Sequence, residues 1–179
     1  MVCDMKPKPF RPEPIPDSDI YMRDCETGLV WHRCTMRVLY VDTDRSQVVY
    51  HANYLRYFEF GRTSLMREAQ YPYKEIEAKG YVYPIVDLGI KFYGPLYYDD
   101  PMWVYSRPAE IERVKVRFDY IITHGETGSM ICTGYTRHCA LNAEGGVVAV
   151  DEGTARIWEK FPDWGEEENS PQSRRGRRE

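Results

Sequence analysis

Within residues 31–41, the polar residues Arg33, Thr35 and Arg37 alternate with the apolar residues Cys34, Met36, Val38 and Tyr40. A period of two places the apolar side chains on one face of an extended chain and the polar ones on the other. Residues 31–41 are therefore predicted to form a half-buried β-strand. Residues 1–24, by contrast, are rich in proline and polar groups and are predicted to form an extended or disordered arm.

The segment from about residue 49 to residue 69 follows a different pattern. It contains no proline and places Leu55, Phe58, Leu65 and Ala69 at helical spacings. Additional aromatic residues make this helix apolar on more than one side, which indicates that other structure surrounds it. The sequence predicts this segment as its one long helix.

The chain from residue 81 to residue 158 has the pattern of strands joined by turns. Glycine and asparagine stand at residues 126–129 and 142–146, as tight hairpin turns require. The pattern predicts an antiparallel meander of five strands at residues 81–93, 102–112, 115–123, 130–141 and 147–158.

A sheet of about five to six strands can bury a single long helix only by curling around it, because other arrangements leave an apolar surface in water. The predicted fold is therefore α+β, an antiparallel sheet wrapped around one long central helix, and it spans residues 25–161. Such an open sheet has edge strands and an incompletely covered face, so two copies are expected to associate.

Composition excludes several functional classes. The chain has 179 residues, and 24 Lys plus Arg against 28 Asp plus Glu give it a net charge of −4. This mild acidity argues against a nucleic-acid-binding protein, and no apolar run approaches the roughly 20 residues that cross a bilayer. The polar N-terminus lacks the apolar stretch of a secretory signal, so a cytoplasmic location is expected. Residues 168–179 contain no apolar residue to anchor them, and residues 162–179 are predicted to be a disordered charged tail.

The densest group of polar residues lies between the first strand and the helix, where Asp42 and Asp44 precede His51. Two carboxylates just before a helix favour a capping role, since the first N–H groups of a helix lack partners. A metal site is a second interpretation, but no third hard ligand is evident. The third interpretation is chemical: a helix N-terminus binds a developing oxyanion while a carboxylate attacks a carbonyl or activates water.

These two parts suffice for acyl transfer from a thioester. A thiol with a pKa near 8.5 is already a fair leaving group, so a strong general acid is not needed. His51 is suited to position water, hold the acyl carbonyl or assist proton transfer. A capping or packing role for His51 is the plainer alternative.

The motif D-T-D-x-x-x-V-V-Y-H-A-N-Y-L-R-Y-F-E at residues 42–59, followed by P-L-Y-Y-D-D-P at residues 95–101, resembles hot-dog-fold acyl-CoA thioesterases of the 4-hydroxybenzoyl-CoA thioesterase type. The resemblance is closest to the bacterial subgroup that includes the Tol-Pal-associated enzyme, and it runs from about residue 36 to residue 158. It implies a sheet wrapped round one helix, in agreement with the fold predicted from the pattern alone.

The resemblance assigns roles by position. Asp44 matches the catalytic carboxylate, and His51 matches the helix-start residue whose backbone N–H polarises the thioester carbonyl. Tyr40 matches a tyrosine four residues before the acid in the bacterial subgroup, which leaves Asp42 as a supporting, structural acid. Relatives carry glycine just before the V-V-Y-H segment, where this chain has Gln47, a change expected to narrow the pocket, alter acyl preference or weaken turnover.

Coenzyme A carries several phosphates, which call for Lys or Arg near the mouth of the pocket. Arg113, Lys115 and Arg117 alternate along one strand face, in a segment where the resemblance places basic residues that meet the nucleotide. An ordinary solvated strand face is the alternative.

Tyr57, Ile85 and Val86 are the candidates for contact with the acyl group, with a plain core role as the alternative for each. In hot-dog enzymes the pocket is built at the dimer interface, so the resemblance implies a homodimer or homotetramer in which one subunit faces substrate held by the other.

The main functional prediction is hydrolysis of acyl-CoA thioesters, with Asp44 as nucleophile or general base and the His51 N–H as oxyanion donor. The His51 side chain and Tyr40 are predicted to assist, and no metal or redox cofactor is implied. Two alternatives stay open: a non-catalytic acyl-CoA or acyl-carrier binding module of the same fold, suggested by Gln47, and an enoyl-CoA hydratase of the wider hot-dog superfamily.

Overall fold

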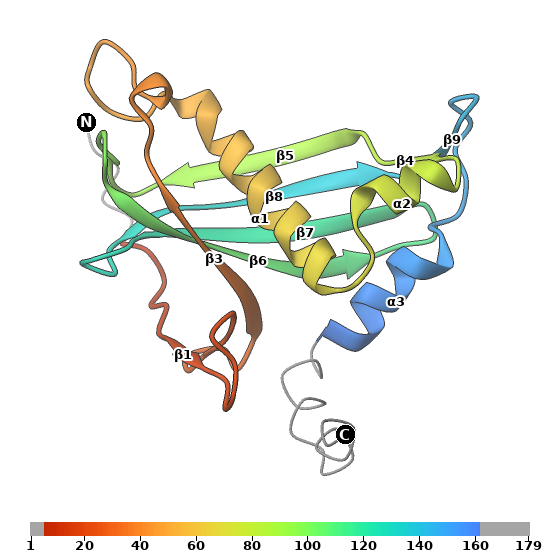
Figure 1. The fold of residues 1–179 in the computed structure, drawn as a ribbon, viewed down its shortest axis with the longest axis horizontal. Coiled ribbons are helices and arrows are strands. Elements are labelled where there is room, and N and C mark those ends of the chain that lie inside the picture. Colours follow the sequence, from red (N-terminus) through yellow and green to blue (C-terminus); the bar gives the residue numbers. More distant parts are fainter. Residues whose placement is uncertain (1–5, 162–179) are drawn as a thin grey trace, which may run out of the picture.

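A computed structural model describes residues 6–161 (Figure 1). Seven strands form one antiparallel sheet in the order β1-β2-β3-β6-β7-β8-β5, and a long helix, α1 (Tyr54–Glu68), lies across one face of it. The predicted α+β hot-dog architecture is confirmed, with seven strands in place of five to six. The strands of this sheet are β1 (Pro12–Pro14), β2 (Tyr21–Asp24), β3 (Val30–Arg37), β5 (Ile85–Phe92), β6 (Pro101–Ile111), β7 (Lys115–His124) and β8 (Met130–Cys139).

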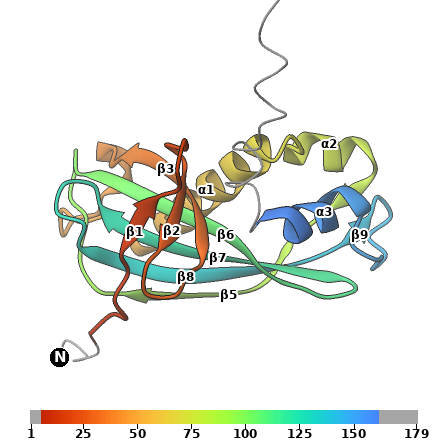
Figure 2. The same cartoon turned by 90° about the horizontal axis from the view of Figure 1, so that it is seen from below.

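Short elements complete the fold, and the helices lie together on one side of the sheet (Figure 2). None of the described helices is long and apolar enough to cross a membrane. The short elements are the 3-10 helices η1 (Tyr40–Asp42) and η2 (His51–Asn53), the helices α2 (Tyr73–Ala78) and α3 (Glu152–Lys160), and the paired strands β4 (Tyr81–Val82) and β9 (Leu141–Asn142).

The buried face of α1 packs directly on the central strands. Phe58 and Leu65 are fully buried there, and each such side chain stabilises the fold by about 1.5–3 kcal/mol. Phe58 stacks on Tyr120 of β7, with ring centroids 4.3 Å apart. At Gly61 the helix approaches β6 so closely that any side chain would collide with Ser106. This close contact fixes the position of α1 on the sheet.

The predicted N-terminal arm is part of the sheet where the structure describes it. β1 and β2 extend the sheet beyond β3, and Met22 of β2 is buried. Phe10 packs edge-on against Tyr105 on the face of the sheet away from α1, with ring centroids 4.9 Å apart. The sheet therefore begins before the predicted domain boundary at residue 25. Residues 1–5 and the predicted tail at 162–179 lie outside the described residues.

The predicted five-stranded meander is wrong in two places. β5 pairs with β8 at the edge of the sheet and not with the next strand in the sequence, because the connection at residues 93–100 is too long for a tight hairpin. Residues 147–158, predicted as a strand, contain most of α3 instead. Asp151 caps this helix by accepting the backbone N–H of Thr154 at 3.0 Å, and this N-terminal signal outweighs the strand-like alternation.

The capping residue of α3 is also a buried hub. Asp151 is 6% exposed and accepts the hydroxyls of Tyr71 and Tyr83, each at 2.7 Å. Burial alone would raise the pKa of Asp151, but the hydrogen bonds from Thr154 and the two tyrosines outweigh it and lower that pKa. This carboxylate ties α3 to the segment between α1 and β5.

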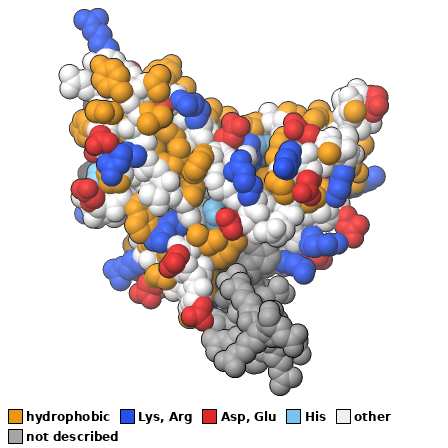
Figure 3. Space-filling model, viewed as in Figure 1, with side chains coloured by type: hydrophobic (Ala, Val, Ile, Leu, Met, Phe, Trp, Pro, Cys, Tyr) orange, Lys and Arg blue, Asp and Glu red, His pale blue; other side chains and the backbone are white. Residues whose placement is uncertain are grey.

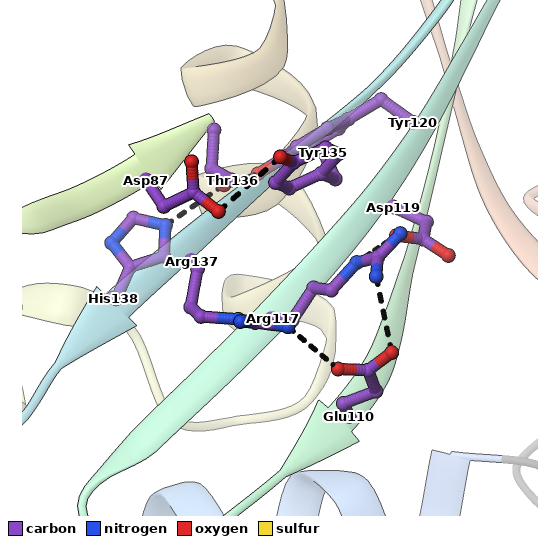
Figure 4. Close-up of polar contacts among 9 residues, drawn as sticks. All are labelled: Asp87, Glu110, Arg117, Asp119, Tyr120, Tyr135, Thr136, Arg137 and His138. Carbon is purple, nitrogen blue, oxygen red and sulfur yellow. Dashed lines mark hydrogen bonds and ion pairs between the residues drawn. The ribbon is translucent and has the colours of Figure 1, made fainter. Parts of the chain in front are cut away.

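Two histidines, His32 of β3 and His138 of β8, are buried. The Nδ1–H of His138 donates to the carbonyl of Tyr83 at 2.9 Å. Its Nε2 accepts the hydroxyl of Thr136 at 2.8 Å (Figure 4). Burial lowers the pKa of both histidines to about 4, and the charge of Arg62 adds to this effect at His138. Both rings are therefore neutral at physiological pH.

We expect the free energy of unfolding to fall as the pH drops from 7.5 to 5. The unfolded chain binds a proton at each histidine below about pH 6.5 and the folded chain only near pH 4, so each of His32 and His138 removes about 2 kcal/mol at pH 5. Urea titrations at the two pH values measure this loss. The variant His138→Gln should lose less stability between the two pH values than the wild type, and an equal loss would contradict the assignment.

Candidate active site

The candidate residues lie on the segment that leads from β3 into α1, at one end of the sheet (Figure 1). Residues 39–53 of this segment are termed the entry loop. A bridge between Thr43 and Val49 folds the loop back on itself, and the backbone N–H of Val49 donates to Leu96 at 2.9 Å. α1 begins only at Tyr54, later than the predicted start near residue 49, because η2 precedes it.

Asp42 is the buried acid of the entry loop, with 2% of its surface exposed. Its carboxylate accepts the Arg56 guanidinium at 2.7 Å, the Tyr57 hydroxyl at 2.9 Å and the backbone N–H of Leu39 at 3.2 Å. Burial and the Asp42 carboxylate raise the pKa of Tyr57, which therefore stays a hydrogen-bond donor. Asp42 faces the helix and has no open space in which to meet a substrate.

Asp44 is the exposed acid of the entry loop. It forms a turn in which Oδ1 accepts the N–H of Ser46 at 2.7 Å and the Asp44 carbonyl accepts the N–H of Gln47 at 2.9 Å. Within residues 6–161, Oδ2 of Asp44 has no hydrogen-bond partner. The capping interpretation is wrong for α1, because neither carboxylate accepts a backbone N–H of that helix. Asp44 binds a backbone N–H of the loop, and Asp42 binds side chains of α1.

Backbone donors without acceptors lie at the other end of the entry loop. The N–H of Tyr50 donates to Asp42 and that of Asn53 donates to Tyr50, but the N–H groups of His51 and Ala52 have no acceptor in the part of the chain that the structure describes. These N–H groups lie at the N-terminal end of α1, which is the positive end of the helix dipole, and they face solvent. The His51 ring is exposed and lies against the ring of Tyr50, with centroids 4.3 Å apart.

Tyr40 lies in η1 and is 77% exposed. Its ring packs edge-on against Tyr98, at 5.6 Å between centroids, and it makes no side-chain hydrogen bond with Asp44 among the described residues. Exposed apolar side chains gather around the entry loop, as the upper left of Figure 3 shows. They are Leu39, Tyr40, Val41, Tyr50, Tyr97 and Tyr98.

Within a single chain, the predicted acyl-contact residues Tyr57, Ile85 and Val86 do not lie together. Tyr57 is buried in the core with its hydroxyl on Asp42, so it does not line an open pocket. Ile85 and Val86 are exposed at the start of β5, whereas the other end of that strand, Phe92, packs at 4.9 Å from the Tyr54 ring. Seven residues of strand, about 23 Å, separate Ile85 from the start of α1.

The predicted phosphate-binding residues are also distant from the entry loop. Arg113 lies in the exposed β6–β7 turn, and Lys115 and Arg117 project from the face of the sheet away from α1. Arg117 is already paired with Asp119 at 2.8 Å and with Glu110 at 3.0 Å (Figure 4). The structure therefore does not bring these cations together with Asp44 and His51 in one chain.

Two features of the site escaped the sequence analysis. One is the burial of Asp42. The sequence signal that could have indicated it is the presence of two hydrogen-bond donors, Arg56 and Tyr57, in the first turn of the helix that follows. The other is the backbone of Gln47, which has a φ of 65°, in the left-handed region that glycine favours. Gln47 therefore keeps the path that a glycine would give this turn. For metal binding, the described residues hold no group of three His, Cys, Asp or Glu side chains.

Comparisons with known proteins find thioesterases among the proteins that are similar to this chain. A family model described as the thioesterase-like superfamily matches residues 38–165. The chain is 30% identical over 129 residues to "Putative acyl-CoA thioesterase YneP" of Bacillus subtilis, covering 72% of this chain and 88% of the relative. It is 27% identical over 94 residues to "Acyl-CoA thioester hydrolase YbgC" of Escherichia coli, covering 52% and 70%. A solved structure, "Probable Thioesterase from Bartonella henselae", superposes with a TM-score of 0.63 at 28% identity, covering 68% and 99%.

The matched region contains the entry loop, α1 and the central strands β6, β7 and β8, so it carries both Asp44 and His51. The matched region covers well over half of the chain, and the structure has the hot-dog fold. The chain belongs to the thioesterase-like superfamily.

Proposed function

We propose that the protein hydrolyses acyl-CoA thioesters to a free acid and coenzyme A. One observation carries the proposal: among residues 6–161, one oxygen of the exposed Asp44 carboxylate has no hydrogen-bond partner, and the backbone N–H groups of His51 and Ala52 have no acceptor. Superfamily membership supports the reaction class. The likeness to YbgC, an acyl-CoA thioester hydrolase, supports an acyl-CoA substrate. The finer assignment to the 4-hydroxybenzoyl-CoA thioesterase type, closest to the bacterial Tol-Pal-associated subgroup, and a cytoplasmic location are part of the proposal.

The chemistry needs only these groups. The thioester carbonyl oxygen binds the His51 N–H, where the helix dipole stabilises the negative charge that develops on it. The Asp44 carboxylate attacks the carbonyl carbon, or removes a proton from a water molecule that attacks it, and the carbon–sulfur bond breaks to release coenzyme A as a thiolate. In the first route, water then cleaves the acyl–Asp44 anhydride. The His51 side chain and Tyr40 are proposed to hold the water and the acyl group.

We propose that the site is completed by a second copy of the chain, paired through β5. The two edges of the sheet differ: β1 has three residues, two of them proline, whereas β5 has eight residues and exposes Ile85, Val86 and Leu88. Proline and short length protect an edge from pairing, so β5 is the edge suited to association.

Antiparallel pairing of two β5 strands about their middle would bring the partner copy's start of β5 beside Phe92. The acyl-contact candidates Ile85 and Val86 would then lie near the start of α1 of the other copy. A homodimer, alone or within a homotetramer, thus reunites residues that lie about 23 Å apart in one chain.

The position of Gln47 argues against the non-catalytic alternative. The missing glycine was the reason to expect a binding module, yet the left-handed backbone at this position is retained. The turn that presents Asp44 is therefore closed by its hydrogen bond at 2.9 Å, as the chemistry requires.

Asp44→Asn should lower kcat at least about 100-fold, with KM changed much less, because the nucleophile or base is removed and the turn is kept. Thiol release from a panel of short, long and aromatic acyl-CoAs measures this. Asp99→Asn is the matched control, since Asp99 is also an exposed aspartate in a turn at this end of the sheet. Hydrolysis by Asp44→Asn at the wild-type rate would remove Asp44 from the mechanism.

Leu88→Lys should convert the protein to a monomer and lower kcat/KM at least about tenfold, because a charge in the middle of β5 opposes its own copy across the two-fold axis. Sedimentation velocity and hydrolysis rates are measured on the same samples. Val147→Lys places the same charge at another exposed apolar residue and should change neither quantity. A monomeric variant with full activity would show that one copy suffices.

Gln47→Gly should raise the free energy of unfolding by up to about 1 kcal/mol, or leave it unchanged, because relief of the left-handed conformation is partly offset by chain entropy. Gln47→Ile should lower it by about 1–2 kcal/mol, since a β-branched residue fits this conformation poorly. Urea unfolding measures both changes.

The control for Gln47 is Gln70→Gly, because Gln70 is also exposed and has a φ of 56° but lies at the end of α1. The two glycine variants should agree in stability and differ in acyl-chain preference, which only Gln47→Gly should alter. An unchanged preference would place the Gln47 side chain outside the pocket.

A further inference from the structure

We propose that Asp42 is a positioning residue for hydrolysis, which holds the Asp44 turn and the His51 backbone N–H in a fixed relation to each other. The inference rests on the proposed function for its catalytic consequence. Its structural basis is that both the side chain and the carbonyl of one buried residue bind the segments on which the reacting groups lie.

The Asp42 side chain fastens the entry loop to α1. One carboxylate oxygen accepts the Arg56 guanidinium at 2.7 Å, and the other accepts the Tyr57 hydroxyl at 2.9 Å. Both donors belong to the first turn of the helix. Charge-assisted hydrogen bonds of this kind are the stronger ones, and the bond to Tyr57 joins two buried side chains, whereas the Arg56 side chain is 60% exposed. Asp44, two residues further along, is therefore held close to the start of α1.

The Asp42 carbonyl binds the opposite end of the loop. It accepts the backbone N–H of Tyr50 at 2.9 Å and the side-chain amide of Asn53 at 2.8 Å. These two donors flank His51 and Ala52, whose own N–H groups have no acceptor among the described residues. Asp42 thus fixes the chain on both sides of the proposed oxyanion donors.

The consequence is geometric. Asp44 follows Asp42 by two residues, and His51 lies between two donors to the same carbonyl, so a shift of Asp42 changes the distance between the two reacting groups. Misplacement by about 1 Å can cost about 100-fold in rate. Neither Asp42 nor Arg56 needs to touch the substrate for this effect.

The matched control is Asp151, the other buried carboxylate that accepts tyrosine hydroxyls. It binds Tyr71 and Tyr83 as Asp42 binds Tyr57, but its contacts anchor α3 and none of them reaches the entry loop. Asp42→Asn and Asp151→Asn therefore disturb similar bonds in different places. Asn53→Ala is a milder variant for the case that Asp42→Asn does not fold, since it removes a single hydrogen bond of the Asp42 carbonyl.

The experiment measures kcat, KM and the melting temperature of the three variants, at a temperature where each one under test is folded. Asp42→Asn should lower kcat at least tenfold and Asn53→Ala about threefold, with KM within twofold of wild type. Asp151→Asn should lower the melting temperature and keep kcat within twofold. The proposal is overturned if Asp42→Asn folds and keeps the wild-type kcat. If Asp42→Asn does not fold, a wild-type kcat in Asn53→Ala overturns it instead. A loss of kcat in Asp151→Asn equal to that in the entry-loop variant would also overturn it.

Hydrogen exchange followed by mass spectrometry separates this proposal from the proposed function. Amides of residues 43–53 should exchange faster in Asp42→Asn and Asn53→Ala than in the wild type, and at the wild-type rate in Asp151→Asn. If the wild type hydrolyses no acyl-CoA but this pattern appears, the hydrolase assignment fails and the positioning role of Asp42 stands. If the amides of residues 43–53 exchange at the wild-type rate in both Asp42→Asn and Asn53→Ala, the positioning role is excluded, whatever the hydrolysis rates of these variants are.

Discussion

The burial of α1 against one face of a curved sheet is the constraint on which the rest of this structure depends. At Gly61 the helix lies directly on the side chains of Val104 and Ser106 of β6, and Phe58 stacks on Tyr120 of β7. Gly134 of β8 is required for the same reason, because a side chain there would collide with Phe58. With its inner face so tightly fixed, α1 meets solvent along its outer face and at its ends, and the residues just before its first turn carry N–H groups without acceptors among the described residues.

The connections at either end of α1 are each secured by a buried carboxylate that accepts tyrosine hydroxyls. Asp42 binds Tyr57 ahead of the helix, and Asp151 binds Tyr71 and Tyr83 beyond it. A buried carboxylate without partners is costly, so each must keep all of its donors. The same physical device thus serves two purposes, since Asp42 shapes a loop with exposed polar groups and Asp151 caps a helix that covers the sheet.

The sequence allowed the hot-dog fold and the candidate loop to be predicted, because alternation and helical spacing report directly on which faces are buried. The strand predicted at residues 147–158 is wrong because Asp151 accepts the backbone N–H of Thr154, and this helix cap outweighs the strand-like alternation. Sequence order also could not show that β5 pairs with β8. The motif assigned Asp44 a catalytic role and Asp42 a structural one by resemblance, but only the tertiary contacts show that Asp42 is buried and Asp44 is exposed.

The left-handed backbone of Gln47 shows that the entry loop keeps an unfavourable backbone conformation at a residue other than glycine. A non-glycine residue in this conformation costs about 1 kcal/mol and persists only where the surroundings determine the chain path. Here the path is determined on both sides, by the bridge between Thr43 and Val49 and by the contact of Tyr50 with Asp42. The loop therefore holds its turn by tertiary contacts and not by local preference. A side chain at this position then adds bulk beside Asp44 without altering the backbone that presents it.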